Sequence, residues 1–175
     1  MTRIPNIFVT VGTQLPFDRL IGTVAKWHSK HPDIEICYVV GDTKLTAKDF
    51  GRGETHTRLK PKPYAQRFFA ADLIVSHAGM GTIITTAEVG KPIVIMPRRA
   101  DLGEHRNDHQ LATAEKMAHL QNVQRVDTHD DLIRALDHFV QTWSENETTA
   151  GTLGSNADPA LLAAVRDFIF ESRPE

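Results

Sequence analysis

Short apolar runs alternate along this sequence with longer segments of helical periodicity. The runs lie at 6–11, 34–40, 73–77, 92–97 and 122–126, and a further short strand is expected near 55–59. Between them the sequence predicts helices over 17–28, 63–70, 82–89, 107–118 and 128–143. Apolar strands separated by helices are typical of a parallel sheet covered on both faces. We therefore expect an α/β fold, a Rossmann-like, doubly wound parallel sheet.

The domain organisation follows from the length and from one polar stretch. A chain of 175 residues suits a single well-packed domain. We expect that domain to span 1–143 and a linker of low hydrophobicity to span 144–157. Residues 158–175 are expected to form a C-terminal amphipathic helix, because Asp158 suits the N-cap and Pro159 the first helical position.

Composition excludes several classes of protein. The formal net charge of −2 lacks the basic excess of a general nucleic-acid binder. Cys37 is the single cysteine, so no intramolecular disulfide is possible, and its apolar surroundings indicate a buried thiol. The N-terminal apolar stretch is too short for a signal peptide, and no segment approaches the roughly 20 apolar residues that cross a bilayer.

Polar residues follow three of the expected strands at the ends where those strands stop. Gly12, Thr13 and Gln14 follow the first strand, Ser76 and His77 end a later one, and the polar loop 98–110 follows the run 92–97. Ligands of doubly wound sheets bind beyond the carboxyl ends of the strands. The sequence therefore predicts a binding site at this edge.

The stretch "SHAGMGT" joins a strand to a helix that we expect to open at Gly81 and Thr82. Free amides at a helix N-terminus suit a diphosphate, and Gly79 and Gly81 would let it approach closely. A tight strand-to-helix turn without a ligand is the alternative. Ile84 occupies the third glycine position of the dinucleotide fingerprint, which disfavours a Rossmann dehydrogenase.

The stretch "GEHRNDHQ" is rich in hydrogen-bonding side chains. His105 and His109 have i,i+4 spacing, but no further ligand completes a metal site nearby, so no metal is expected. The stretch suits sugar hydroxyls, and an ordinary solvated helix start is the alternative. Arg98 and Arg99 precede it, and we interpret them as an exposed basic pair rather than as ligands of a carboxylate or phosphate.

Three quoted segments together resemble one family. "VTVGTQLPFDRL", "ADLIVSHAGMGTIITTAEVGKPIVIMPR" and "LGEHRNDHQLATA" resemble the donor-binding half of MurG-like glycosyltransferases over roughly residues 6–126. More closely, they resemble the small subunit of two-part enzymes, namely the cytosolic subunit of the eukaryotic dolichol-linked N-acetylglucosamine transferase and the PssE-type subunit of bacterial exopolysaccharide synthesis. The resemblance implies the C-terminal half of a GT-B glycosyltransferase.

The resemblance also implies which residues bind the nucleotide sugar. Residues 60–64 match the loop that contacts uracil in the family. The family's first loop corresponds to Gly12, Thr13 and Gln14. Its diphosphate-binding turn corresponds to His77, Gly79, Met80, Gly81 and Thr82. Its sugar-binding loop corresponds to Glu104, His105, Asn107, His109 and Gln110. The family's ribose-binding glutamate is replaced here by Thr85. Glu88, one turn later, either takes that role or is a solvated acid.

The resemblance implies a function in which this chain binds a UDP-sugar without metal or other cofactor. An inverting hexosyltransferase would pass the sugar to a polyprenyl-diphosphate-linked acceptor in exopolysaccharide or lipid-linked glycan synthesis. A membrane-anchored partner subunit would bind that acceptor and supply the general base, so no catalytic residue is expected in this chain and it should be inactive alone. The protein would be cytoplasmic, peripheral to the inner face of the plasma membrane.

Several alternatives stay open at the level of sequence. The helix expected at 159–170 either docks the partner or packs on its own domain. A non-catalytic nucleotide-sugar-binding or regulatory module is the alternative function. A nucleotide-sugar epimerase shares this architecture but needs both halves in one chain, which 175 residues do not provide.

Overall fold

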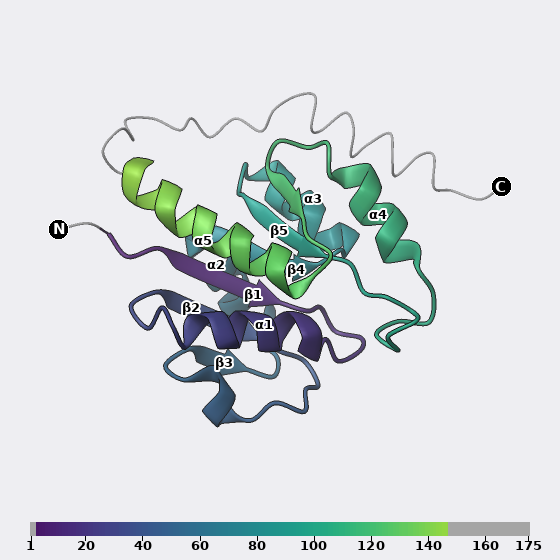
Figure 1. Ribbon diagram of the computed structural model, residues 1–175, viewed down its shortest axis with the longest axis horizontal. Helices are drawn as coiled ribbons and strands as arrows, with labels where there is room; N and C mark the ends of the chain where they lie inside the picture. The colour runs from purple at the N-terminus through teal and green to yellow at the C-terminus, as the bar shows by residue number, and fades with distance from the viewer. Residues whose placement is uncertain (1–2, 147–175) are drawn as a thin grey trace.

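The computed structural model describes residues 3–146, which form a parallel sheet with helices on both faces (Figure 1). Along the chain the elements are β1 (Asn6–Thr10), α1 (Asp18–His28), β2 (Glu35–Val39), the 3₁₀ helix η1 (Ala47–Phe50), β3 (Glu54–His56), α2 (Pro61–Ala70), β4 (Leu73–His77), α3 (Met80–Glu88), β5 (Ile93–Met96), α4 (His109–Met117), β6 (Val123–Arg125) and α5 (His129–Asn146). The expected C-terminal helix, 158–175, lies outside the described residues.

The sheet confirms the predicted fold class. Its strands run in the order β3-β2-β1-β4-β5-β6, and every pairing is parallel. The order reverses between β1 and β4, whose register pairs Thr10 with Ser76 at the carboxyl ends of the two strands. The connections that leave β1 and β4 diverge there toward opposite faces of the sheet. This reversal is the topological switch point, where doubly wound sheets bind their ligands.

Both faces of the sheet are buried, which explains the unbroken apolar runs in the sequence. In β1, Ile7 and Val9 pack on the face that α1 and α5 cover, whereas Phe8 packs on the face that α2, α3 and α4 cover. This alternation follows from the two-residue side-chain period of a strand. Cys37 is buried beside Phe8 in the second cluster, as expected.

Helix ends agree with the local sequence signals, with some shifts of boundary. The Thr128 hydroxyl accepts a hydrogen bond from the Asp131 amide at 3.1 Å and donates one to its carboxylate at 2.6 Å, so the capping box before α5 is present. α5 extends to Asn146, three residues into the expected linker 144–157, since 144–146 contain no glycine or proline. The strand expected near 55–59 is β3, displaced toward the N-terminus.

The start of α3 differs from the prediction in a way that affects the site. The helix was expected to open at Gly81 and Thr82 but begins at Met80, with Gly79 as N-cap. The Ile83 amide donates to the Gly79 carbonyl at 3.2 Å, which closes the first turn. Glycine inside a helix costs only about 1 kcal/mol relative to alanine, so Gly81 does not prevent the earlier start.

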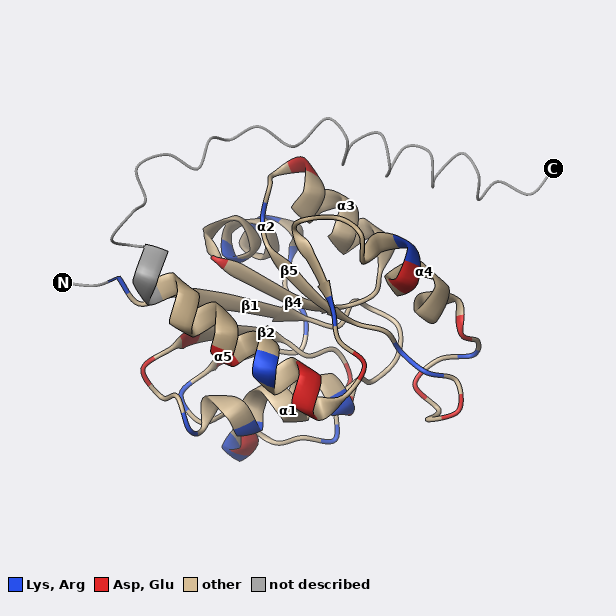
Figure 2. Ribbon diagram, turned by 45° about the horizontal axis from the view of Figure 1, so that its top comes forward, with Lys and Arg blue, Asp and Glu red and all other residues tan. Residues whose placement is uncertain are grey.

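Charged residues surround the sheet instead of gathering on one face. Figure 2 shows acidic and basic positions interspersed around the edge of the molecule. Among the described helices, none combines the length and the apolarity that a membrane span requires.

Candidate functional site

A cavity of about 380 Å³ opens at the carboxyl edge of the sheet, over the switch point between β1 and β4. We call it the edge cavity. The β1–α1, β4–α3 and β5–α4 connections supply its walls, as the polar loops in the sequence predict. It is lined by Val11, Gly12, Thr13, Gln14, His77, Ala78, Gly79, Met80, Gly81, Thr82, Arg98, His105, His109, Gln110 and Thr113. The predicted site residues Glu88, Glu104 and Asn107 are not part of this lining.

The N-terminus of α3 directs free backbone amides at the edge cavity. The Gly79 amide donates to the His77 carbonyl at 2.8 Å. Among the hydrogen bonds of the described residues, the amides of Met80, Gly81 and Thr82 have no acceptor, as expected for a first helical turn. These three donors coincide with the positive end of the helix dipole. The turn can therefore accept an anion.

The His77 ring explains two of the glycines. A Cβ atom on Gly12 would lie 2.8 Å from the Cε1 atom of His77, and one on Gly79 would overlap the same ring. Gly12 also has a φ of +75°, which side chains disfavour. The sequence analysis predicts that Gly79 allows close approach of a ligand. In the structure the His77 imidazole already occupies the space beside Gly79. At Gly81 an added Cβ would meet nothing within 4 Å.

The charge state of His77 follows from its surroundings. Burial, followed by the neighbouring Arg98 guanidinium, lowers the pKa of His77 to about 4. The imidazole is therefore neutral near pH 7. The hydroxyl of Ser76 lies 3.2 Å from its Nδ1 atom and helps to orient the ring.

Arg98 corrects the expectation of an exposed basic pair. Its side chain is only 1% exposed, and its guanidinium stacks on Phe17 at 4.6 Å. The guanidinium donates to four backbone carbonyls, at 2.9, 2.5, 2.6 and 3.2 Å, those of Val11, Leu15, Pro16 and Glu104. These bonds join the β1–α1 loop to the β5–α4 loop. An irregular loop leaves its carbonyls without partners, and the planar fork of an arginine satisfies several at once.

Arg99 is exposed, as the sequence predicted for both arginines. Its guanidinium pairs with the Asp101 carboxylate at 2.7 Å on the outside of the β5–α4 loop.

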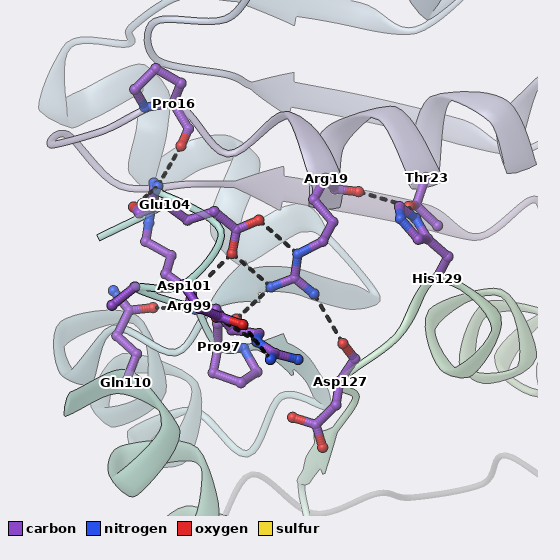
Figure 3. Close-up of polar contacts among 12 residues, drawn as sticks. Pro16, Arg19, Thr23, Pro97, Arg99, Asp101, Glu104, Gln110, Asp127 and His129 are labelled. Carbon is purple, nitrogen blue, oxygen red and sulfur yellow. Dashed lines mark hydrogen bonds and ion pairs between the residues drawn. The ribbon is translucent and has the colours of Figure 1, made fainter. Parts of the chain in front are cut away.

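Glu104 supports the site without lining it. The Arg19 guanidinium holds both of its carboxylate oxygens, at 2.7 and 2.8 Å, and also donates to the carbonyls of Pro97 and Asp127 (Figure 3). The Arg99 amide donates to the same carboxylate at 3.0 Å. Glu104 therefore holds the β5–α4 loop against α1, which local sequence did not reveal because Arg19 lies 85 residues away.

The β5–α4 loop brings His105 to the edge cavity, and the first residues of α4 bring His109 and the side-chain amide of Gln110. The rings of His105 and His109 meet edge to face, with their centroids 4.5 Å apart. The side-chain oxygen of Asn107 accepts from the His109 amide at 3.4 Å, in the turn just before α4. The Gln110 side-chain oxygen accepts from the Arg98 amide at 3.1 Å, which fixes Gln110 at the cavity wall. Partial burial and the nearby His105 lower the pKa of His109.

A second cavity, also of about 380 Å³, adjoins the first and lies between α2 and α3. We call it the α2–α3 groove. Its lining residues are Tyr64, Ala65, Phe68, Phe69, Gly81, Thr82 and Thr85. Within the range 60–64 matched to the uracil loop, Tyr64 reaches this groove. Glu88 is exposed at the far end of α3, about 12 Å along the helix axis from Met80, and lines neither cavity.

The lining of the edge cavity is suited to anions. It contains Arg98, three histidines and the free amides of α3, and no aspartate or glutamate. Mg²⁺ and Ca²⁺ prefer carboxylate oxygens, which this lining does not offer. Elsewhere in the described chain, Cys37, Glu54 and His56 place their potential ligand atoms within 4.8 Å of one another. The Arg67 guanidinium already pairs there with the Glu54 carboxylate at 2.5 Å.

Comparisons with known proteins agree with this architecture. The family model described as "Glycosyltransferase family 28 C-terminal domain" matches residues 6–161. The chain is 31% identical over 128 residues to the human "UDP-N-acetylglucosamine transferase subunit ALG13", across 63% of this chain and 10% of that protein. It is 28% identical over 124 residues to a UDP-N-acetylglucosamine–N-acetylmuramyl-(pentapeptide) pyrophosphoryl-undecaprenol N-acetylglucosamine transferase of Alkaliphilus metalliredigens, across 65% of this chain and 33% of that enzyme.

Solved structures share the fold. A solution structure of ALG13 aligns with a TM-score of 0.58 at 16% identity, across 95% of this chain and 98% of that one. The fold is that of the C-terminal half of GT-B glycosyltransferases, as expected. The chain spans only a tenth of the human relative and a third of the bacterial one. Because the family match covers most of its length, the chain belongs to the family of glycosyltransferase family 28 C-terminal domains.

Proposed function

We propose that this chain is the donor-binding subunit of a glycosyltransferase and that it holds a UDP-sugar in the edge cavity. One observation carries the proposal: three free amides at the start of α3 open into a cavity that has no carboxylate in its lining. A nucleoside diphosphate sugar carries its negative charge on the diphosphate, which such donors bind well.

The same amides have a chemical role in sugar transfer. When the sugar leaves the nucleotide, negative charge grows on the diphosphate, and preorganised donors stabilise that charge in the transition state. Loss of one such donor typically reduces kcat by about 10²–10³-fold. His77 would contribute as a neutral hydrogen-bonding wall, because its pKa of about 4 keeps it uncharged. Amides and histidines would thus replace the metal ion that other transferases use.

The sugar itself would lie against the β5–α4 loop. His105, His109 and Gln110 present side chains that donate to and accept from hydroxyl groups. The clamp of Arg19 on Glu104 holds this loop in place. A sugar seated there would have its anomeric carbon next to the diphosphate, open to attack by an acceptor hydroxyl from the opposite side, which inverts the configuration.

We further propose that a partner completes the enzyme. The human relative is named a transferase subunit, and this chain matches about a third of the bacterial relative. The partner would be membrane-anchored, bind a polyprenyl-diphosphate-linked acceptor and carry the general base. The pair would act in exopolysaccharide or lipid-linked glycan synthesis at the inner face of the plasma membrane, and this chain would be inactive alone.

Titration calorimetry tests the donor site directly. The full chain should bind UDP and UDP-sugars without added metal, and should not bind NAD. His109→Ala should weaken UDP-sugar binding at least fivefold, whereas the control His119→Ala, an exposed histidine outside both cavities, should not. Absence of UDP binding, or equal effects of the two variants, would contradict the proposed site.

Co-expression tests the partner. Membranes containing this chain and the candidate membrane-anchored subunit should transfer labelled sugar to lipid, and either protein alone should not. Transfer by the purified single chain would disprove the need for a partner. UDP-sugar binding without transfer in any combination would favour the alternative of a non-catalytic regulatory module.

A further inference from the structure

The α2–α3 groove is largely apolar. α2 contributes Tyr64, Phe68 and Phe69, and the first half of α3 contributes Gly81, Thr82 and Thr85. Phe69 is 52% exposed and forms an aromatic wall of the groove together with Tyr64 and Phe68. No aspartate, glutamate, asparagine or glutamine lines the groove. The occupant must therefore offer apolar or aromatic surface.

Two of the three hydroxyls of the groove already have partners. The Tyr64 hydroxyl donates to the Thr10 hydroxyl at 3.3 Å. The Thr85 hydroxyl donates to the Gly81 carbonyl at 2.9 Å, within its own helix. The third, that of Thr82, is half-buried, and none of the groove's side-chain oxygens is both buried and without a partner.

The groove and the edge cavity meet at the start of α3. Gly81 and Thr82 line both, and their amides belong to the free donors of the first turn. If the diphosphate of a nucleotide sugar lay at that shared rim, one end of the nucleotide sugar would extend into each cavity. The polar end, the sugar, fits the edge cavity with its histidines, and the flat nucleobase with its pentose fits the apolar groove.

We infer that the groove takes the nucleoside of the donor and does not read the 2′-hydroxyl of its pentose, so that the subunit accepts ribose and deoxyribose donors, uridine and thymidine alike. The inference rests on the proposed function. A site rejects an analogue without a hydroxyl when its own buried polar group is left unpaired. Apart from the amides of Gly81 and Thr82, which the diphosphate would take, this groove has no such group. The methyl group of thymine would meet aromatic and aliphatic surface.

Calorimetry with the full chain and three nucleotides tests the inference. UDP and dUDP should bind within about threefold of each other, because no groove residue is left unpaired. dTDP should bind equally or up to about fourfold more tightly, from burial of its methyl group. If UDP binds and dUDP binds at least tenfold more weakly, the inference fails and the proposed function stands. If none of the three binds, both fail.

Two exposed apolar residues provide a matched pair of variants that tests where the nucleoside binds. Phe69→Ser should weaken UDP and dTDP binding roughly tenfold through loss of base stacking, and should leave inorganic pyrophosphate binding unchanged. Leu102→Ser is the control, since Leu102 is 53% exposed and lines neither cavity. Equal nucleotide affinity in both variants would overturn the placement of the nucleoside in the groove.

Discussion

Replacing Arg98 with methionine should destabilise the domain far more than the same change at Arg99. Methionine keeps most of the length of the side chain but removes every donor. Four backbone carbonyls then lose their partner, those of Val11, Leu15 and Pro16 in one loop and Glu104 in the other.

The magnitude follows from these bonds. A hydrogen bond to a charged group contributes about 1.5–3 kcal/mol, but water entering the vacated space recovers part of the sum of four. We therefore expect the free energy of unfolding to fall by about 3–5 kcal/mol, less than that sum, since each buried carbonyl left without a donor costs about 1–3 kcal/mol before water reaches it. A domain of this size has a total stability of about 5–15 kcal/mol, so Tm should fall by roughly 10 °C.

Urea denaturation followed by circular dichroism measures the difference. Arg99→Met is the matched control and should cost less than about 1 kcal/mol, because Arg99 and Asp101 form an exposed pair. Arg98→Lys keeps the positive charge but has a single ammonium nitrogen in place of the forked guanidinium. It should therefore recover only part of the stability that Arg98→Met loses. Equal destabilisation by Arg98→Met and Arg99→Met would refute the assignment of Arg98 as the link between the two loops.

Three further predictions concern the site and the core. Gly79→Ala should weaken UDP binding at least tenfold, because its Cβ displaces the His77 ring. Gly81→Ala should leave Tm within about 2 °C of the original protein, since its Cβ meets open space. If calorimetry and thermal melting gave similar results for the two variants, this difference between the two glycines would be contradicted. Bound diphosphate should raise the pKa of His109 from its lowered value, so UDP binding should take up a proton and become tighter as pH falls from 8 toward 6. Calorimetric titration in buffers of different ionisation enthalpy detects this proton uptake. Proton release on binding would contradict the prediction. Burial raises the pKa of Cys37 to about 11, so iodoacetamide at pH 8 should alkylate the thiol only after unfolding, and rapid labelling of the native protein would count against a buried thiol.

Much of the fold is encoded locally, and this is why the sequence predicts it. Strands such as β1 are apolar on both faces, and helices such as α1 carry one apolar stripe, so both periods appear within a few residues. Placement of the site follows from topology, since carboxyl ends of parallel strands share one edge. Helix starts are less determined, because Gly79 and Gly81 are both tolerable at the first turn of α3.

Long-range contacts account for what sequence reasoning missed. Arg98 and Arg99 are adjacent and chemically identical, and only the path of the β1–α1 loop decides which of them is buried. Glu104 resembled a sugar ligand until its pairing with Arg19 became visible in three dimensions. Glu88 lies on α3 as expected, but the two turns between it and the start of the helix separate it from the edge cavity.

The glycine spacing of "SHAGMGT" has two separate physical causes. Position 79 requires glycine because the His77 ring lies against it. Gly12, 67 positions earlier, lies against the same ring and is required for the same reason. Gly81 has no such neighbour, and its missing side chain leaves the rim between the two cavities open. A packing requirement therefore explains the first glycine without any ligand, whereas the second has no explanation inside the protein. The residue that argues most directly for a bound molecule is consequently Gly81, since only an occupant of that rim would penalise a larger side chain there.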